Sequence, residues 1–331
     1  MKIRREKWTL WIMLAVILLA ACSGDDTQSD TYVGDDTQEI RFSADVRQVK
    51  SGTRITTIDN PAGLQLQDIR IDAYVNGTNT SVISRAMLHY ADASWKFWGS
   101  GVETHYYWPI EGSYIAIEGS YIGPVTSLDF VGYCPFTKPG NLPSEPAYAS
   151  SAVTFSCDMS NYMTSAAQAS LTEFMYAILP AQTYATQVAA RGRLPLVFQH
   201  PFARIKFVNG NPATIMIKKI TFKNIYTKGS FSSNSNPKWS GLDSKADFVA
   251  DINHANYNLP AAIGDSYIVL PQDFAGDIEV VATWIDWGED FDHTVTATVP
   301  TTWQPGYSYT YTFNIRNRDL IVNLEKYTEQ W

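Results

Sequence analysis

Residues 303–331 read WQPGYSYTYTFNIRNRDLIVNLEKYTEQW, and their pattern decides the fold class of the chain. After the Pro305-Gly306 turn, apolar and polar residues alternate strictly, which predicts a β-strand with one buried face. That face carries Tyr307, Tyr309, Tyr311, Phe313 and Ile315. A second alternating run follows a polar break and places Leu320, Val322 and Leu324 on one face.

No strand pattern follows this second run, so we expect it to have no later hairpin partner. A terminal apolar strand either packs against its own domain or is offered to a neighbour, because an exposed strand edge invites pairing. The opposite end of the chain indicates that it is offered. Residues 39–46, EIRFSADV, alternate in the same way and place Ile40, Phe42, Ala44 and Val46 on one face. Two strands of matched period can fill the same kind of groove.

The body of the chain predicts an all-β fold. Aromatic residues make up 13% and charged residues 18% of the sequence, and Val, Ile and Thr are frequent, which favours strands. Between the two terminal strands we expect further strands at 69–75, 93–97, 114–118, 128–133, 152–157, 174–179, 194–199, 203–208, 214–223, 267–270, 278–285, 294–299 and 307–315. Many short strands with regular turns predict two antiparallel β-sandwich domains, at 39–190 and 191–331. A single large sandwich is the alternative.

The first residues predict export and not a folded element. Basic residues precede the apolar run 10–19, and Leu19-Ala20-Ala21-Cys22 supplies small residues before a cysteine. This sequence resembles the bacterial lipobox, so we expect residues 1–21 to be a lipoprotein signal peptide and Cys22 to be lipidated, anchoring the chain to the outer membrane. Residues 22–38 repeat Gly-Asp-Asp-Thr-Gln with few apolar residues, which predicts a disordered acidic tether.

Net charge and cysteine content limit the binding partners and the disulfide bonds that we expect for this chain. A net charge of −8 gives no electrostatic basis for binding nucleic acid. With Cys22 lipidated, Cys134 and Cys157 remain. In an oxidising compartment they could form a disulfide, stabilising the fold by about 3 kcal/mol. Two free, buried thiols are the alternative, because the sequence does not give the distance between them.

The sequence carries no enzyme signature and predicts no cofactor or metal. His-Glu-x-x-His, Gly-x-Ser-x-Gly, Cys-x-x-Cys and a phosphate-binding glycine loop are all absent from it. We expect His200 to have a packing or turn role. The acidic run 285–293, IDWGEDFDH, has oxygen ligands for Ca²⁺ but is typical of a solvated hairpin loop. The aromatic group Trp95, Phe97, Trp98, Tyr106, Tyr107 and Trp108 could stack on sugars, but core filling is favoured.

Several segments together resemble the fimbrillin family of Bacteroidales, the lipoprotein subunits of surface pili. They are TRITT at 53–57, YYWPIEGSYIAIEGSY at 106–121, EFMYAILPAQ at 173–182, PLVFQHPFARIKFVN at 195–209, IKKITFKNIYTKGSF at 217–231, YIVLPQDF at 267–274 and WQPGYSYTYTFNI at 303–315. Their order and spacing cover nearly all of residues 39–331. The resemblance implies two tandem transthyretin-like β-sandwich domains, a lipidated precursor and assembly into a cell-surface fimbria.

The resemblance also implies a mechanism. In the family, a trypsin-like protease cuts after an arginine and the first strand leaves. The C-terminal strand of the next subunit then fills the vacated groove. Arg54 is the best match for the cut residue and Arg47 is the second choice. Other fimbrial subunits and the processing protease are the expected partners. The alternatives are a non-polymerising lipid-anchored protein, a fimbrial anchor or a tip adhesin that binds a glycan or host protein, and a secreted enzyme with paired carboxylates.

Overall fold

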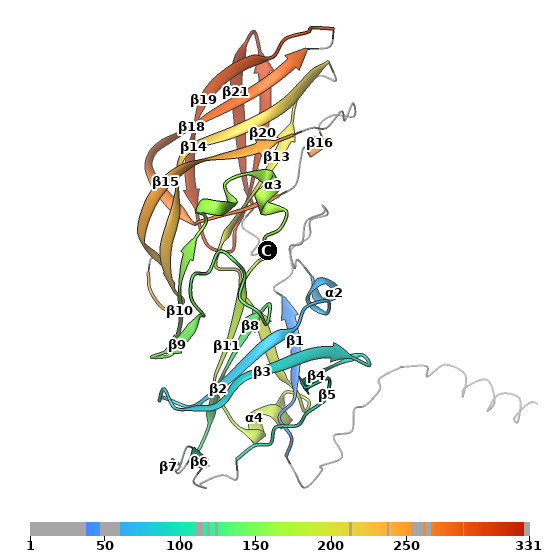
Figure 1. Cartoon of the computed structure of the whole chain (residues 1–331), viewed down its shortest axis with the longest axis vertical. Coiled ribbons are helices and arrows are strands. Elements are labelled where there is room, and N and C mark those ends of the chain that lie inside the picture. The colour runs from blue at the N-terminus through green and yellow to red at the C-terminus, as the bar shows by residue number, and fades with distance from the viewer. Residues whose placement is uncertain are drawn as a thin grey trace, which may run out of the picture. The chain divides into compact units, whose positions relative to one another are not determined.

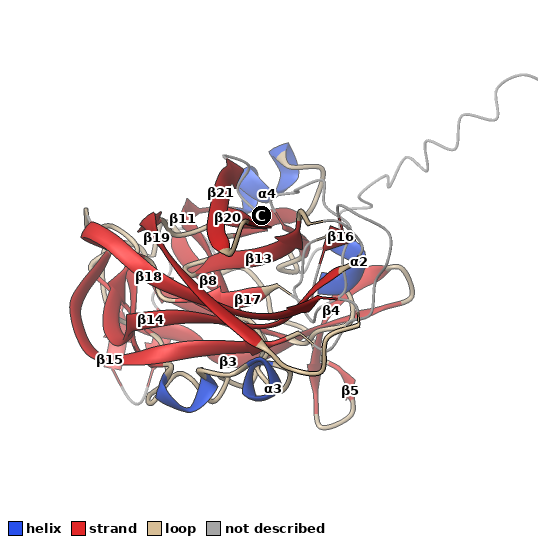
Figure 2. Ribbon diagram, turned by 90° about the horizontal axis from the view of Figure 1, so that it is seen from above, coloured by secondary structure: helices blue, strands red, loops and turns tan. Residues whose placement is uncertain are grey.

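The computed structural model describes residues 38–46, 60–109, 115–117, 120–122, 125–211, 214–236, 238–252, 261–262, 266–286 and 288–327. Strands dominate these residues and the helices among them are short (Figure 2). The predicted all-β fold class is confirmed. The predicted signal peptide, Cys22, the tether, Arg47 and Arg54 lie outside the described residues.

The first large sheet is antiparallel throughout. Its strands are β2 (Ile69–Val75), β3 (Ser81–Ala91), β4 (Ser94–Gly99), β5 (Val102–Glu103), β8 (Leu128–Cys134) and β11 (Met175–Gln182). They lie in the order β11-β8-β2-β3-β4-β5 (Figure 1). The sequence predicted β2, β8 and β11 but not β3. Six of the residues of β3 are only half-buried, so its apolar alternation is weak.

Two further sheets contain most of the C-terminal residues. One comprises β9 (Ala147–Ala149), β10 (Ala152–Asp158), β14 (Ile215–Ser232), β15 (Trp239–Asp251), β18 (Gln272–Asp286) and β19 (His293–Trp303). The other comprises β13 (Ala203–Asn209), β16 (Ala261–Ala262), β17 (Tyr267–Val269), β20 (Ser308–Arg316) and β21 (Asp319–Tyr327). Its β13 and β20 are parallel, whereas β20 and β21 form an antiparallel hairpin.

The remaining elements are small. The strand β1 (Phe42–Val46) pairs in parallel with β12 (Leu194–Phe198), and β6 (Ile115–Ile117) pairs with β7 (Ser120–Ile122). The helices are α2 (Pro61–Leu64), the 3-10 helix η1 (Ser160–Tyr162), α3 (Ser165–Gln168) and α4 (Tyr184–Ala189). Helices η1 and α3 follow β10 in the chain, and α4 lies between β11 and β12.

Two clusters of buried side chains form the interior. The β1 cluster gathers β1, β2, β12 and their neighbours, and the β20 cluster gathers β10, β13, β14, β18 and β20. Strand β8 belongs to both, because side chains alternate along a strand. Phe130 and Cys134 point into the β1 cluster, whereas Val131 and Tyr133 point into the β20 cluster. All seven residues of β8 are therefore buried.

The predicted domain boundary at 190/191 remains a prediction, but the clusters cross it in both directions. Strand β12 follows the boundary and packs in the β1 cluster beside a strand that precedes it. Strand β10 precedes the boundary and pairs with β14, which follows it. Each predicted sandwich thus takes a strand from the other side of residue 190.

Candidate functional site

The apolar face of β1 is almost completely buried. Ile40, Phe42 and Val46 are each 1% exposed, and Ala44 is half-buried. The Phe42 ring packs edge-on against Phe97 and Phe130, with centroids 5.8 and 5.2 Å away. These four residues are the ones that the sequence pattern placed on one face. We call the surroundings of this strand the β1 slot: β12, residues 106–108, Phe97, Phe130 and Gln187.

Main-chain hydrogen bonds hold the strand on both edges. Ile40 N–H donates to the Tyr106 carbonyl (2.8 Å), and Trp108 N–H donates to the Gln38 carbonyl (2.9 Å). On the other edge, Leu194 N–H donates to the Arg41 carbonyl (2.8 Å), where the parallel ladder with β12 begins. These bonds are independent of the side chains of the strand that they hold.

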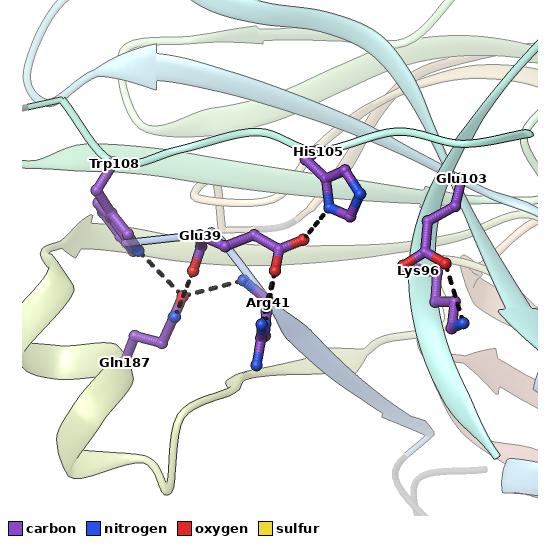
Figure 3. Close-up of polar contacts among 7 residues, drawn as sticks. All are labelled: Glu39, Arg41, Lys96, Glu103, His105, Trp108 and Gln187. Atoms are coloured by element: carbon purple, nitrogen blue, oxygen red, sulfur yellow. Dashed lines mark hydrogen bonds and ion pairs between the residues drawn. The ribbon is translucent and has the colours of Figure 1, made fainter. Parts of the chain in front are cut away.

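One side chain, Gln187, takes part in the same edge (Figure 3). Its Oε1 accepts from Arg41 N–H (3.0 Å) and from the Trp108 indole N–H (3.1 Å), and its Nε2 donates to the Glu39 carbonyl (2.7 Å). The side chain is fully buried. Two donors face one end of the amide and a carbonyl faces the other, so the hydrogen-bond network fixes the orientation of the amide.

The Glu39 carboxylate forms a second polar contact at the start of the strand. It lies 2.6 Å from His105 Nδ1 and 2.8 Å from an Arg41 guanidinium nitrogen, beside the separate Lys96–Glu103 pair (Figure 3). Burial raises the pKa of Glu39, but hydrogen bonds from His105 and Arg41 outweigh it and hold the pKa below its ordinary value.

Helix α4 presents Gln187 to the slot and is capped at both ends. Thr183 and Thr186 form a reciprocal capping box at its start. At its end, Gly192 adopts a φ of +82° and its N–H donates to the Gln187 carbonyl (2.9 Å). Capping compensates for the shortness of the helix, which would be unstable as an isolated peptide.

The apolar residues of the predicted donor strand, β21, lie in or against the β20 cluster. In β21, Leu320 is 8% exposed, and Val322 and Leu324 are half-buried. They lie opposite Ile315, Phe313 and Tyr311 of β20. Within one chain, therefore, the predicted donor face and the predicted displaced face are not brought together. The single chain pairs β21 with β20, so the strand is not offered in this state.

The two thiols are free, as in the second alternative that the sequence left open. Cys134 lies in the β1 cluster and Cys157 in the β20 cluster. Burial raises the pKa of both thiols far above the ordinary value. A thiol that stays protonated is a poor nucleophile, so neither is placed for redox chemistry.

The other residues singled out in the sequence have structural surroundings. His200 is buried and its Nδ1 lies 2.5 Å from Glu173 Oε1. The acidic run joins β18 to β19, where Asp292 pairs with Lys218 and Glu289 with His293. Of the aromatic group, Trp95, Phe97 and Trp108 are buried in the β1 cluster, whereas Tyr107 is half exposed.

Within the described ranges, no three His, Cys, Asp or Glu side chains gather as they would around a metal ion. The helices described there are too short or too polar to cross a membrane.

Nothing in the sequence signals the role of Gln187. The flanking Thr183 and Gly192 are helix start and stop signals and could have predicted α4. A glutamine that bonds main chain some 146 residues earlier leaves no local pattern.

Comparisons with known proteins agree with this architecture. The sequence model of a family described as fimbrillin-like matches residues 53–331. A fimbrial protein from Bacteroides vulgatus is similar with a TM-score of 0.56 at 13% identity, over 89% of this chain and 99% of that one. A candidate cell adhesion protein from Bacteroides ovatus gives 0.53 at 17% identity, over 89% and 98%. At these identities the likeness shows the fold. No curated protein matches the chain.

Proposed function

The chain belongs to the fimbrillin-like family, and we propose that it is a structural subunit of a cell-surface fimbria that assembles by strand exchange. The family is a fimbrial one and not an enzyme family. In the proposed cycle, the chain is exported as a lipoprotein precursor anchored to the outer membrane through Cys22. A protease cuts after Arg54, β1 leaves, and β21 of a neighbouring subunit enters the β1 slot.

The contrast between the two strands carries the proposal. On the apolar face of residues 40–46, three side chains are 1% exposed, whereas β21 has one buried side chain and two half-buried ones on its apolar face. Moving β21 into the slot of another subunit would bury Val322 and Leu324 more completely. Burying such a side chain fully stabilises by about 1.5–3 kcal/mol relative to full exposure. Because both side chains are already half-buried, the gain is about half of that for each. Main-chain bonds in the slot, such as those that Tyr106 and Leu194 make to β1, would replace the ladder lost from the hairpin with β20.

The placement of the two faces supports exchange between subunits. Because β1 and β21 lie in different clusters of one chain, insertion of β21 into a β1 slot is favoured between neighbours. Such a head-to-tail contact need not close on itself, and its open repetition makes a filament.

The N-terminus of the protein on the cell surface tests the proposal, and mass spectrometry would identify it. A chain that begins at Ile55 has lost β1 and supports strand exchange. Arg54→Ala should then abolish the processed form, while the matched Arg47→Ala should not. A surface protein that begins at lipidated Cys22 and still forms fibres would contradict the proposal.

A second candidate function is a lipid-anchored module that does not polymerise, as a fimbrial anchor or a tip adhesin for a glycan or host protein. The observation in its favour is that the single chain fills its own β1 slot and pairs its own β21. A lipidated Cys22 terminus without fibres would support this candidate, and glycan-array binding would separate adhesin from anchor.

A further inference from the structure

The hydrogen bonds of Gln187 extend the main-chain ladder beside β1. The ladder with β12 begins where Leu194 N–H donates to the Arg41 carbonyl. In a parallel ladder, the next groups along that edge, Arg41 N–H and the Glu39 carbonyl, would bond to the residue two positions before Leu194. Gly192, which stands there, instead closes helix α4 by donating to the Gln187 carbonyl.

The Gln187 amide takes the place of the main-chain groups of that residue. It accepts from Arg41 N–H and donates to the Glu39 carbonyl, which are the two bonds that residue 192 would make if the ladder continued to it. Its third bond, from the Trp108 indole, ties it to the segment on the opposite edge of the strand.

We propose that Gln187 is a positioning residue of the β1 slot. Its hydrogen bonds to main-chain atoms fix the register of the strand that occupies the slot, first β1 and then β21 of a second copy of this chain. The claim about the second strand rests on the proposed function. The two hydrogen bonds from Gln187 to β1 go to main-chain atoms, so a strand of different sequence can make them.

Register selection follows from burial. A strand shifted by one residue would turn the required carbonyl and N–H to the other edge and its apolar side chains out of the cluster. The buried amide would then lose its partners, which costs more than the hydrogen bonds themselves contribute. Gln187 thus penalises misplaced strands without selecting a side chain.

The test measures how fast the strand leaves the slot. A specific protease site placed between Ser51 and Gly52 of the full chain would be cut, leaving β1 held without a covalent link. A fluorescent peptide of residues 38–46, added in excess, would replace it, and fluorescence anisotropy would follow the exchange. Gln187→Met keeps the length of the side chain and removes its amide. Exchange should be about tenfold faster, the effect of losing roughly one net hydrogen bond.

A matched control is available in Gln168. This side chain is also buried and hydrogen-bonds main-chain atoms. Its Nε2 donates to the Ile268 carbonyl (2.8 Å) and its Oε1 accepts from Ile268 N–H (3.0 Å). Gln168→Met should leave exchange unchanged. Gln187→Glu, which keeps an acceptor but loses the donor to Glu39, provides a second variant and should also speed exchange. Equal rates for Gln187→Met and wild type, or equal acceleration by Gln168→Met, would overturn the proposal.

A second peptide separates this inference from the proposed function. A fluorescent peptide of residues 319–327 should enter the emptied slot of the wild type and be held less long by Gln187→Met. Equal retention of this peptide by wild type and Gln187→Met would overturn the claim that Gln187 positions β21. If this peptide enters neither protein, the strand-exchange proposal fails. The 38–46 peptide still decides whether the hydrogen bonds of Gln187 hold β1 by its main chain.

Discussion

Phe42 packs β1 against the interior of the β1 cluster. It is buried and contacts two aromatic rings edge-on, an arrangement that adds to the free energy of simple burial. Phe42→Ala should lower the free energy of unfolding by about 3–5 kcal/mol, because a cavity replaces the ring. Urea unfolding followed by tryptophan fluorescence would measure the change.

Ser43→Ala is the neighbouring control. Ser43 is exposed on the opposite face of β1, so its substitution should change the free energy of unfolding by less than about 0.5 kcal/mol. Equal unfolding midpoints for the two variants would mean that the apolar face of β1 does not stabilise the protein.

Glu39 links the retention of β1 to pH. Its pKa in the folded chain is lowered from an ordinary value of 4.5. A lowered folded pKa gives a stabilising contribution that is complete above the unfolded value and is lost as the pH falls through the folded one. His105 and Arg41 are 46% and 44% exposed at their side chains, so the contribution is at most about 1 kcal/mol.

Comparison of wild type with Glu39→Gln tests this linkage. The difference in free energy of unfolding should shrink as the pH falls below about 4.5. Urea titrations at each pH would measure it. A difference that grows below pH 4.5 would have the wrong sign for a lowered pKa.

At the scale of elements, β21 can be removed without dismantling the sheet that carries it. Its partner β20 retains β13 on the other edge, and Tyr309, Tyr311 and Phe313 stay within the β20 cluster. Deletion of residues 319–331 should therefore leave a folded, secreted monomer that forms no fibres. Circular dichroism and electron microscopy would check both parts.

Substitutions test the apolar face of β21 at full length. Val322→Asp with Leu324→Asp should also prevent fibres, because charges would enter the β1 slot of the neighbour. Ile321→Asp with Asn323→Asp is the matched control, since both residues are exposed on the opposite face. Normal fibres from the deletion, or from the first double variant, would contradict donation of β21.

At the scale of the whole molecule, the sequence predicted which face of a strand is buried wherever apolar and polar residues alternate. Tyr309, Tyr311, Phe313 and Ile315 are buried as the pattern required. The pattern could not show that β8 faces two clusters, because a strand buried on both sides reads as a continuous apolar run. It missed β15, whose exposed residues outnumber the buried ones. Contacts between distant segments, such as Gln187 with β1, leave no period in the sequence.

The crossing of strands between clusters has a consequence for folding. A fragment of residues 191–331 lacks Phe155, which stacks on Phe231 at 4.8 Å and packs edge-on against Trp239 at 5.7 Å. A fragment of residues 39–190 lacks β12, the parallel partner of β1. Each would expose buried aromatic surface and an unpaired strand edge. We therefore expect that neither fragment folds alone, although residues 39–331 do.

Separate expression of the two fragments and of residues 39–331 would test this. Only the long chain should show a sharp unfolding transition in urea, and probes of the two clusters should give the same midpoint. Trp108 reports on the β1 cluster and Trp303 on the β20 cluster. Because β8 supplies side chains to both clusters, unfolding of one cluster removes packing surface from the other. Two fragments that each unfold cooperatively would make residue 190 a true boundary between independent folding units.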